Sequence, residues 1–171
     1  MSSKLDNNTR VKNKEEFWET KRLVRMALFI AMSGLGAWIT LPSPIGTVAL
    51  DSAPGYFLAL FAGGVEGAIV LGLGHLLSAF KVGFPLGPIH ILIGVLMGIC
   101  GLIFRYLNQK INLVIAAITA ILVNGVVINV LLIPLVGMGF FVGMTPVLLL
   151  GSAVNIVLAI VVYRMLNKVK V

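Results

Sequence analysis

The segment INLVIAAITAILVNGVVINVLLI, from Ile111 to Ile133, decides the class of fold. It contains no charged side chain and is longer than the ~20 apolar residues that an α-helix needs to cross a bilayer. Pro134 follows directly and is expected to end the helix there. A run of this length and composition predicts a transmembrane helix.

The rest of the chain has the same apolar character. Of its 171 residues, 59% are hydrophobic and only 11% are charged, and the mean hydropathy is +1.07. A soluble domain carries about 25% charged residues, so a water-soluble fold of this size could not cover its surface. The composition therefore predicts an all-α integral membrane protein folded as one compact helical bundle.

Prolines, glycines and charged residues divide the chain into six predicted transmembrane helices. The predicted helices cover residues 23–41, 52–63, 66–80, 89–104, 111–133 and 147–166. We expect a loop from Gly137 to Pro146 before the last of them. Residues 1–22 form a polar, basic N-terminal arm, residues 23–166 the membrane domain, and residues 167–171 a basic C-terminal tail.

The basic residues favour six helices over the alternative of five, in which residues 54–80 form one long helix. With six helices, all of the 13 Lys and Arg except Lys81 lie on the side of the N-terminus. Cytoplasmic flanks of membrane helices carry an excess of Lys and Arg, so both termini are expected to be cytoplasmic. The same distribution, flanking the apolar runs, explains the formal charge of +7 without a nucleic-acid surface.

Polar side chains inside the predicted helices are candidates for a binding site, because polar groups are costly in lipid. Several fall in the outer halves of the last three helices, and others lie near the outer end of the first helix and the start of the second. Together they predict an outward-open cavity whose candidate substrate contacts are Trp38, Asp51, Tyr56, His90, Asn124, Asn129, Ser152 and Asn155. Buried Asn and Ser can also simply bond neighbouring helices, Trp38 can anchor the interface, and Asp51 can cap a helix.

The spacing of two of these candidates argues against a shared position on the cavity wall. Asn124 and Asn129 are five residues apart and project about 140° apart on an ideal α-helix, so we do not expect both to face one cavity. His75 lies near the middle of the third predicted helix and Glu66 at its start, and neither is assigned a role.

No enzyme, metal or cofactor motif is found in the sequence. It contains no HExxH, GxSxG or Walker A pattern and no Cys/His spacing typical of a metal site. The single cysteine, Cys100, cannot form an intrachain disulfide. We therefore expect no catalytic residues and no cofactor, and a chain that cannot itself drive transport by ATP hydrolysis.

Taken together, the layout resembles a substrate-binding subunit, or S-component, of the energy-coupling-factor (ECF) vitamin importers. The resemblance covers about residues 23–166 and rests on six helices, a basic N-terminal flank and the Ala27-xxx-Ala31 pattern in the first helix. It also rests on the stretches Gly72-Leu73-Gly74-His75-Leu76-Leu77 and Gly83-Phe84-Pro85-Leu86-Gly87-Pro88, although many members carry an Asp where this chain has His75.

The resemblance implies a function. Such subunits bind a vitamin or precursor from outside, dock through the Ala27 and Ala31 face onto a membrane scaffold subunit powered by two ATPases, and topple to release the cargo inside. A bacterial inner-membrane location is implied as well. The stretch from Pro44 to Phe57 is most similar to the branch assigned to α-ribazole, a cobalamin precursor. Riboflavin, thiamine or pantothenate remain alternative cargoes, and a stand-alone carrier remains an alternative class.

Overall fold

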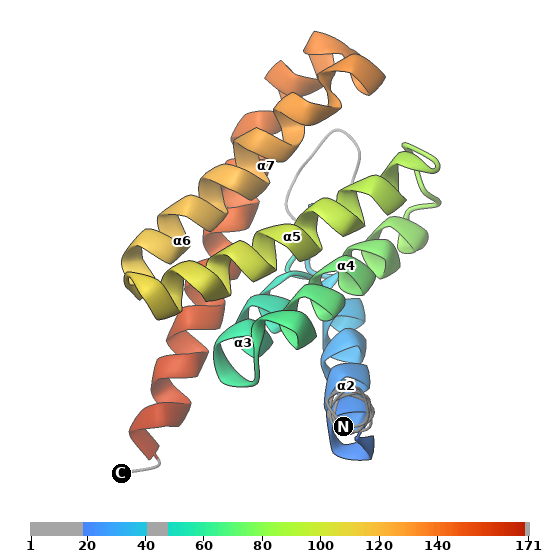
Figure 1. The fold of residues 1–171 in the computed structure, drawn as a ribbon. Helices are drawn as coiled ribbons and strands as arrows, with labels where there is room; N and C mark the ends of the chain where they lie inside the picture. Colours follow the sequence, from blue (N-terminus) through green and yellow to red (C-terminus); the bar gives the residue numbers. More distant parts are fainter. Residues whose placement is uncertain (1–18, 41–47, 170–171) are drawn as a thin grey trace, which may run out of the picture.

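The computed structural model describes residues 19–40 and 48–169, which are almost entirely helical (Figure 1). The first helices are α2 (Thr20–Gly36), α3 (Ala53–Phe61), α4 (Gly64–Lys81) and α5 (Ile89–Lys110). They are followed by α6 (Leu113–Leu122), a π-helical turn η1 (Val123–Val127) and α7 (Ile128–Val169). Most of the predicted basic arm, residues 1–18, lies outside the described residues.

The helix boundaries agree with the sequence prediction in some places and differ in others. A break at Ala62 and Gly63 separates α3 from α4, which confirms two helices rather than one across residues 54–80. Helix α2 ends at Gly36, before the predicted residue 41, and Thr40 beyond it forms an isolated β-bridge with Ala49. Helix α5 continues to Lys110, beyond the predicted end at residue 104.

The predicted loop from Gly137 to Pro146 is wrong. Helix α7 runs through Pro134 and Pro146, and its only non-helical residue is Gly137, with φ 83° and ψ 166°. This backbone conformation is essentially restricted to glycine. A single glycine therefore interrupts the helix, where the sequence had predicted a loop of ten residues. Proline is tolerated inside membrane helices because neighbouring groups satisfy the freed carbonyls.

Within the described part of the chain, two stretches are long and apolar enough to cross a membrane, residues 89–110 and residues 113–168. The second has 56 residues and would be about 84 Å long as a straight helix, more than twice the ~30 Å hydrocarbon core. It therefore has to turn back, and the ribbon reverses at the top of Figure 1. The one non-helical residue inside α7 is Gly137.

Helix α3 is short and largely buried. It has nine residues, about 14 Å, and seven of them are buried. Both of its ends are closed by side chains from distant helices. Asn155 accepts from the backbone N–H of Ala53 at 2.8 Å, and Arg105 donates to the carbonyl of Leu60 at 2.8 Å. At nine residues it is shorter than the ~20 that a straight helix needs to cross a bilayer.

Small residues let the helices approach closely around α4. A Cβ added at Gly74 would lie 2.7 Å from the Cβ of Ser33, so glycine is required where α2 crosses α4. Gly94 and Gly98 of α5 face α4 in the same way, at Gly72 and Ala68. The outer surface is strongly apolar, with side chains such as Leu35 (72% exposed) and Val142 (64% exposed) directed outward, as lipid contact requires.

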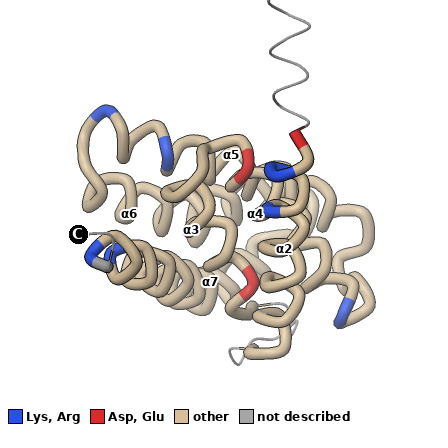
Figure 2. The backbone as a smooth tube through the Cα atoms, turned by 90° about the horizontal axis from the view of Figure 1, so that it is seen from below, with Lys and Arg blue, Asp and Glu red and all other residues tan. Residues whose placement is uncertain are grey.

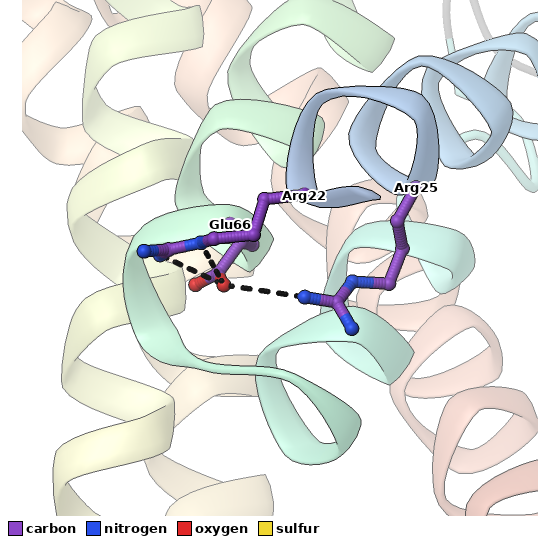
Figure 3. Close-up of polar contacts among 3 residues, drawn as sticks. All are labelled: Arg22, Arg25 and Glu66. Carbon is purple, nitrogen blue, oxygen red and sulfur yellow. Dashed lines mark hydrogen bonds and ion pairs between the residues drawn. The ribbon is translucent and has the colours of Figure 1, made fainter. Parts of the chain in front are cut away.

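Charged residues are few along the helices, as the largely tan tube of Figure 2 shows. One cluster joins α2 to α4 (Figure 3). Glu66 is buried, and its Oε1 accepts from Arg22 Nε at 3.0 Å and lies 3.7 Å from an Arg25 nitrogen. The start of α2 and the end of α7 lie on the same side of the molecule (Figure 1). A cytoplasmic location for that side, and the count of six spanning helices, remain predictions.

Candidate functional site

A cavity of about 70 Å³ lies between α4, α5, η1, α7 and the turn that precedes α3. Its lining is mainly apolar, from Ile93, Met97, Leu132, Phe140 and Met144 among others. Six of the eight predicted substrate contacts line it, although they come from four parts of the chain. These six are Asp51, His90, Asn124, Asn129, Ser152 and Asn155.

The structure does not bring Trp38 and Tyr56 to this cavity. Trp38 is 72% exposed, and the Lys81 ammonium lies 4.8 Å from the centre of its ring. Tyr56 is fully buried on the opposite face of α3, where its hydroxyl lies 3.4 Å from the sulfur of Cys100 and its ring packs edge-on against Phe104. The only described aromatic side chain on the cavity wall, apart from the two histidines, is Phe140.

Asn124 and Asn129 both line the cavity, contrary to the expectation from α-helical spacing. The reason is the π-helical turn η1, which contains Asn124 and ends just before Asn129. Hydrogen bonds in a π-helix join residues five apart, so side chains at this spacing come onto one face. Such turns occur frequently at functional sites. Nothing in the side-chain pattern predicted the extra residue in this turn.

Asn155 holds the turn before α3 in place. Its Oδ1 accepts from the backbone N–H groups of Ser52 at 3.1 Å and Ala53 at 2.8 Å. Its Nδ2 donates to the carbonyls of Ala49 at 2.8 Å and Gly151 at 2.9 Å. All four hydrogen-bonding positions of the amide are therefore used within the chain. Asn155 borders the cavity but acts mainly by positioning the turn that carries Asp51.

Asp51 is the acidic residue of the cavity wall. It is 4% exposed and lies in the turn between α2 and α3. Its Oδ1 accepts from the hydroxyl of Ser52 at 2.9 Å, and the Ser52 side chain makes no capping hydrogen bond to α3. Burial raises the pKa of Asp51 from 3.8 to about 6, while hydrogen bonds from Ser52 and Ser78 lower it. The carboxyl is still ionised at neutral pH.

The two histidines, 15 residues apart in the sequence, meet at the cavity wall. His90 Nδ1 lies 3.1 Å from His75 Nε2, and the backbone N–H of Leu86 donates to His90 Nε2 at 3.3 Å. Since Nε2 of His90 accepts, a neutral His90 carries its proton on Nδ1 and donates it to His75. Among the described residues, no third His, Cys, Asp or Glu joins them to complete a metal site.

Asn129 is held in one orientation by Thr145. The Thr145 hydroxyl donates to the carbonyl of Phe141 at 2.6 Å, which leaves its oxygen free to accept. The Nδ2 of Asn129 donates to that oxygen at 2.9 Å. The amide nitrogen therefore has to face Thr145, and the amide oxygen has to face the other way.

Ala27 and Ala31 lie on the exposed face of α2. Large apolar side chains surround them, including Val24 (61% exposed), Leu28 (60%) and Leu35 (72%). Among the helices described, α2 contacts α3 and α4 through its other face. This surface, defined by Val24, Ala27, Leu28, Ala31 and Leu35, is called the α2 face below.

Sequence reasoning missed three contributors to the site. His75 was noted without a role, although two histidines within apolar helices were a signal that they could pair. Thr145 and Phe140 were assigned to a loop that is helical in the structure. The false loop came from reading Pro134 and Pro146 as helix ends, so no signal in that segment pointed inward.

Comparisons with known proteins agree with this architecture. Residues 21–167 match the family model described as ECF transporter, substrate-specific component. A solved structure described as "Structure and mechanism of the S component of a bacterial ECF transporter" is similar to the chain with a TM-score of 0.66 and 22% sequence identity. The similarity covers 88% of this chain and 97% of that one, and at this identity it shows the fold alone. No curated protein sequence matches the chain.

Proposed function

Since this chain belongs to the family of ECF transporter substrate-specific components, we propose that it captures a small vitamin-type molecule in the cavity and passes it inward. Members of this family are membrane-embedded transport subunits rather than enzymes, and they work with a scaffold subunit and ATPases. The bacterial inner membrane is the location that fits this role.

One observation carries the proposal. Asp51, Asn124 and Ser152, from three separate parts of the chain, meet at one buried cavity. Scattered helix-bonding residues would have no reason to converge in this way. Ligand sites usually enclose about 300–1,000 Å³, so the ~70 Å³ cavity has to widen when cargo enters.

For the cargo, we propose α-ribazole, with riboflavin, thiamine and pantothenate as the alternatives. The apolar wall around Phe140 and Met144 suits a flat ring, and the polar wall around Asp51 suits ribose hydroxyls. Trp38 and Tyr56, the two aromatic candidates from the sequence, lie outside the cavity. We therefore propose that Phe140 stacks on the ring of the cargo.

Binding tests the cargo and the cavity together. Calorimetry with α-ribazole and two unrelated vitamins should show which ligand the purified protein holds. Replacing Asn124 or Ser152 by Ala should weaken binding of that ligand by about tenfold, at ~1.4 kcal/mol per factor of ten. Trp38→Ala is the matched control and should bind normally, because Trp38 lies outside the cavity. Unchanged affinity in both cavity variants would place the site elsewhere.

The α2 face is the proposed docking surface for the scaffold. Its small Ala27 and Ala31 would let a partner helix approach closely, between larger apolar neighbours. The double variant A27L/A31L should lose uptake and scaffold association but keep ligand binding. V157L/V161L alters two exposed apolar positions on α7 and serves as the control. Normal uptake by A27L/A31L would remove the α2 face from the proposal.

Both termini are proposed to be cytoplasmic. Cysteines introduced near residues 5 and 169 should resist an impermeant reagent added from outside, and the native Cys100 is buried and should stay silent. Labelling of either site in intact cells would contradict this topology.

A further inference from the structure

The cavity wall contains a buried acceptor with nothing to bind. Asn129 is 1% exposed, and its Oδ1 has no hydrogen-bond partner among the described residues. Because Thr145 holds the amide nitrogen, the amide cannot turn over to relieve this. Buried polar atoms are nearly always paired in folded proteins. Since Asn129 lines the cavity, an acceptor that has no partner among the described residues points to a donor on the ligand.

Other polar groups of the wall also offer acceptors. The Ser152 hydroxyl donates to the carbonyl of Leu148 at 2.6 Å, so its oxygen can only accept from a ligand. The Asp51 carboxylate has only acceptor positions when ionised. Asn155 has no position left, as described above. Asn124 makes no side-chain hydrogen bond to described residues and can both donate and accept.

The described part of the cavity wall offers no Lys or Arg to neutralise a bound anion. None of the residues lining the cavity is Lys or Arg, and the sequence of residues 41–47 contains neither. Lys81, at the outer end of α4, donates to the carbonyl of Ala37 at 2.8 Å and is not part of the wall. His90 accepts from the Leu86 N–H, which requires an unprotonated Nε2. A carboxylate or phosphate in the cavity would therefore be a buried, uncompensated charge beside Asp51.

From these observations we infer that the cavity selects an uncharged or cationic molecule with N–H or O–H donors and an apolar ring or chain, and rejects carboxylates and phosphates. Asn129 Oδ1 receives one of the donors, and Thr145 is the positioning residue that aims it. This inference rests on the proposed function and narrows its list of cargoes. It disfavours pantothenate, which carries a carboxylate, and any phosphorylated vitamin.

Matched pairs of probes test the charge rule. Calorimetry on the purified full-length protein would compare α-ribazole with its 5′-phosphate, panthenol with pantothenate, riboflavin with its phosphate, and thiamine with its monophosphate. In every pair that binds, the member without the acidic group should bind at least ~100-fold more tightly, a difference of about 2.8 kcal/mol. Equal or tighter binding of an acidic member would overturn the inference while leaving the proposed function intact. If no member of any pair binds, the proposed function fails and the inference fails with it.

Variants test the acceptor itself. Asn129→Leu removes the open oxygen and should weaken the best ligand by about tenfold, without loss of the folded, helical protein. Thr145→Val leaves the Asn129 amide free to turn and should weaken ligand binding by a similar factor. Thr145→Ser keeps the hydroxyl and should bind with wild-type affinity. If Thr145 only stabilised the fold, Thr145→Val would lower the unfolding temperature. We expect instead that Thr145→Val unfolds at the normal temperature but binds the ligand more weakly. Unchanged affinity in Asn129→Leu would show that Oδ1 does not contact the ligand.

Discussion

Replacing Asn155 by Ala is the sharpest test of how the site is held together. The amide joins α7 to the turn before α3 through residues more than 100 positions away in the sequence. It closes the N-terminus of α3, which makes no other side-chain cap. Because α3 is short and buried, water cannot replace these hydrogen bonds.

The expected loss can be worked out from the groups left without a partner. Asn155→Ala removes the acceptor for the N–H groups of Ser52 and Ala53 and the donor to the Ala49 carbonyl. Gly151 keeps its ordinary helical hydrogen bond. Three buried backbone groups at about 1 kcal/mol each give a loss of about 3 kcal/mol in the free energy of unfolding. The melting temperature should fall by about 6–12 °C.

The measurement is unfolding in detergent micelles, by heat and by a denaturing detergent, followed by circular dichroism. Asn112→Ala is the matched control, because Asn112 caps α6 through one exposed hydrogen bond to the Ile115 N–H. That variant should lose about 1 kcal/mol or less. If Asn155→Ala were as stable as the wild type while Asn112→Ala was destabilised, the reasoning about α3 would be refuted.

Three further predictions concern the rest of the fold. A double-mutant cycle between Glu66→Gln and Arg22→Gln should give a coupling energy of about 0.5–3 kcal/mol, since the pair is largely buried; zero coupling would show that it does not hold α2 to α4. Gly137→Ala should lower the free energy of unfolding by about 1–3 kcal/mol because of its backbone conformation, whereas Gly139→Ala, which meets no neighbour, should have little effect. Burial raises the pKa of Asp51 from 3.8 to about 6, so its contribution to stability is complete below pH 3.8 and is lost as the pH rises through about 6, by about 3 kcal/mol in all. Asp51→Asn should therefore flatten the profile of stability against pH over that range. An unchanged slope in this variant would contradict the burial argument.

Much of the fold followed from local sequence patterns. In lipid, a chain must satisfy its own backbone hydrogen bonds, so long apolar runs such as residues 111–133 could only be helical. The break between α3 and α4 was readable from the basic residues, whose distribution favoured two helices over one across residues 54–80. The break in α7 was not, because three glycines and two prolines in one apolar segment offered several places for it. In the structure the break is at Gly137.

The candidate site was partly readable for the same kind of reason. Polar side chains are rare in apolar helices, so His90, Asn129 and Ser152 stood out one by one, and all three line the cavity. Tyr56 and Trp38 were misplaced because composition cannot tell which face of a helix meets a cavity. Tyr56 lies in the hydrophobic core, beside Cys100.

By itself, then, the amino-acid sequence determined the membrane class, the helical state of each apolar run and the identity of most polar residues in the site. These depend on the energy of single groups in lipid and on periodicities of a few residues. The pairing of His75 with His90, the closure of α3 by Asn155 and the shared face of Asn124 and Asn129 were decided only by the tertiary structure. Each of these depends on the angle and register at which whole helices pack, and that is set by contacts between segments far apart in the chain.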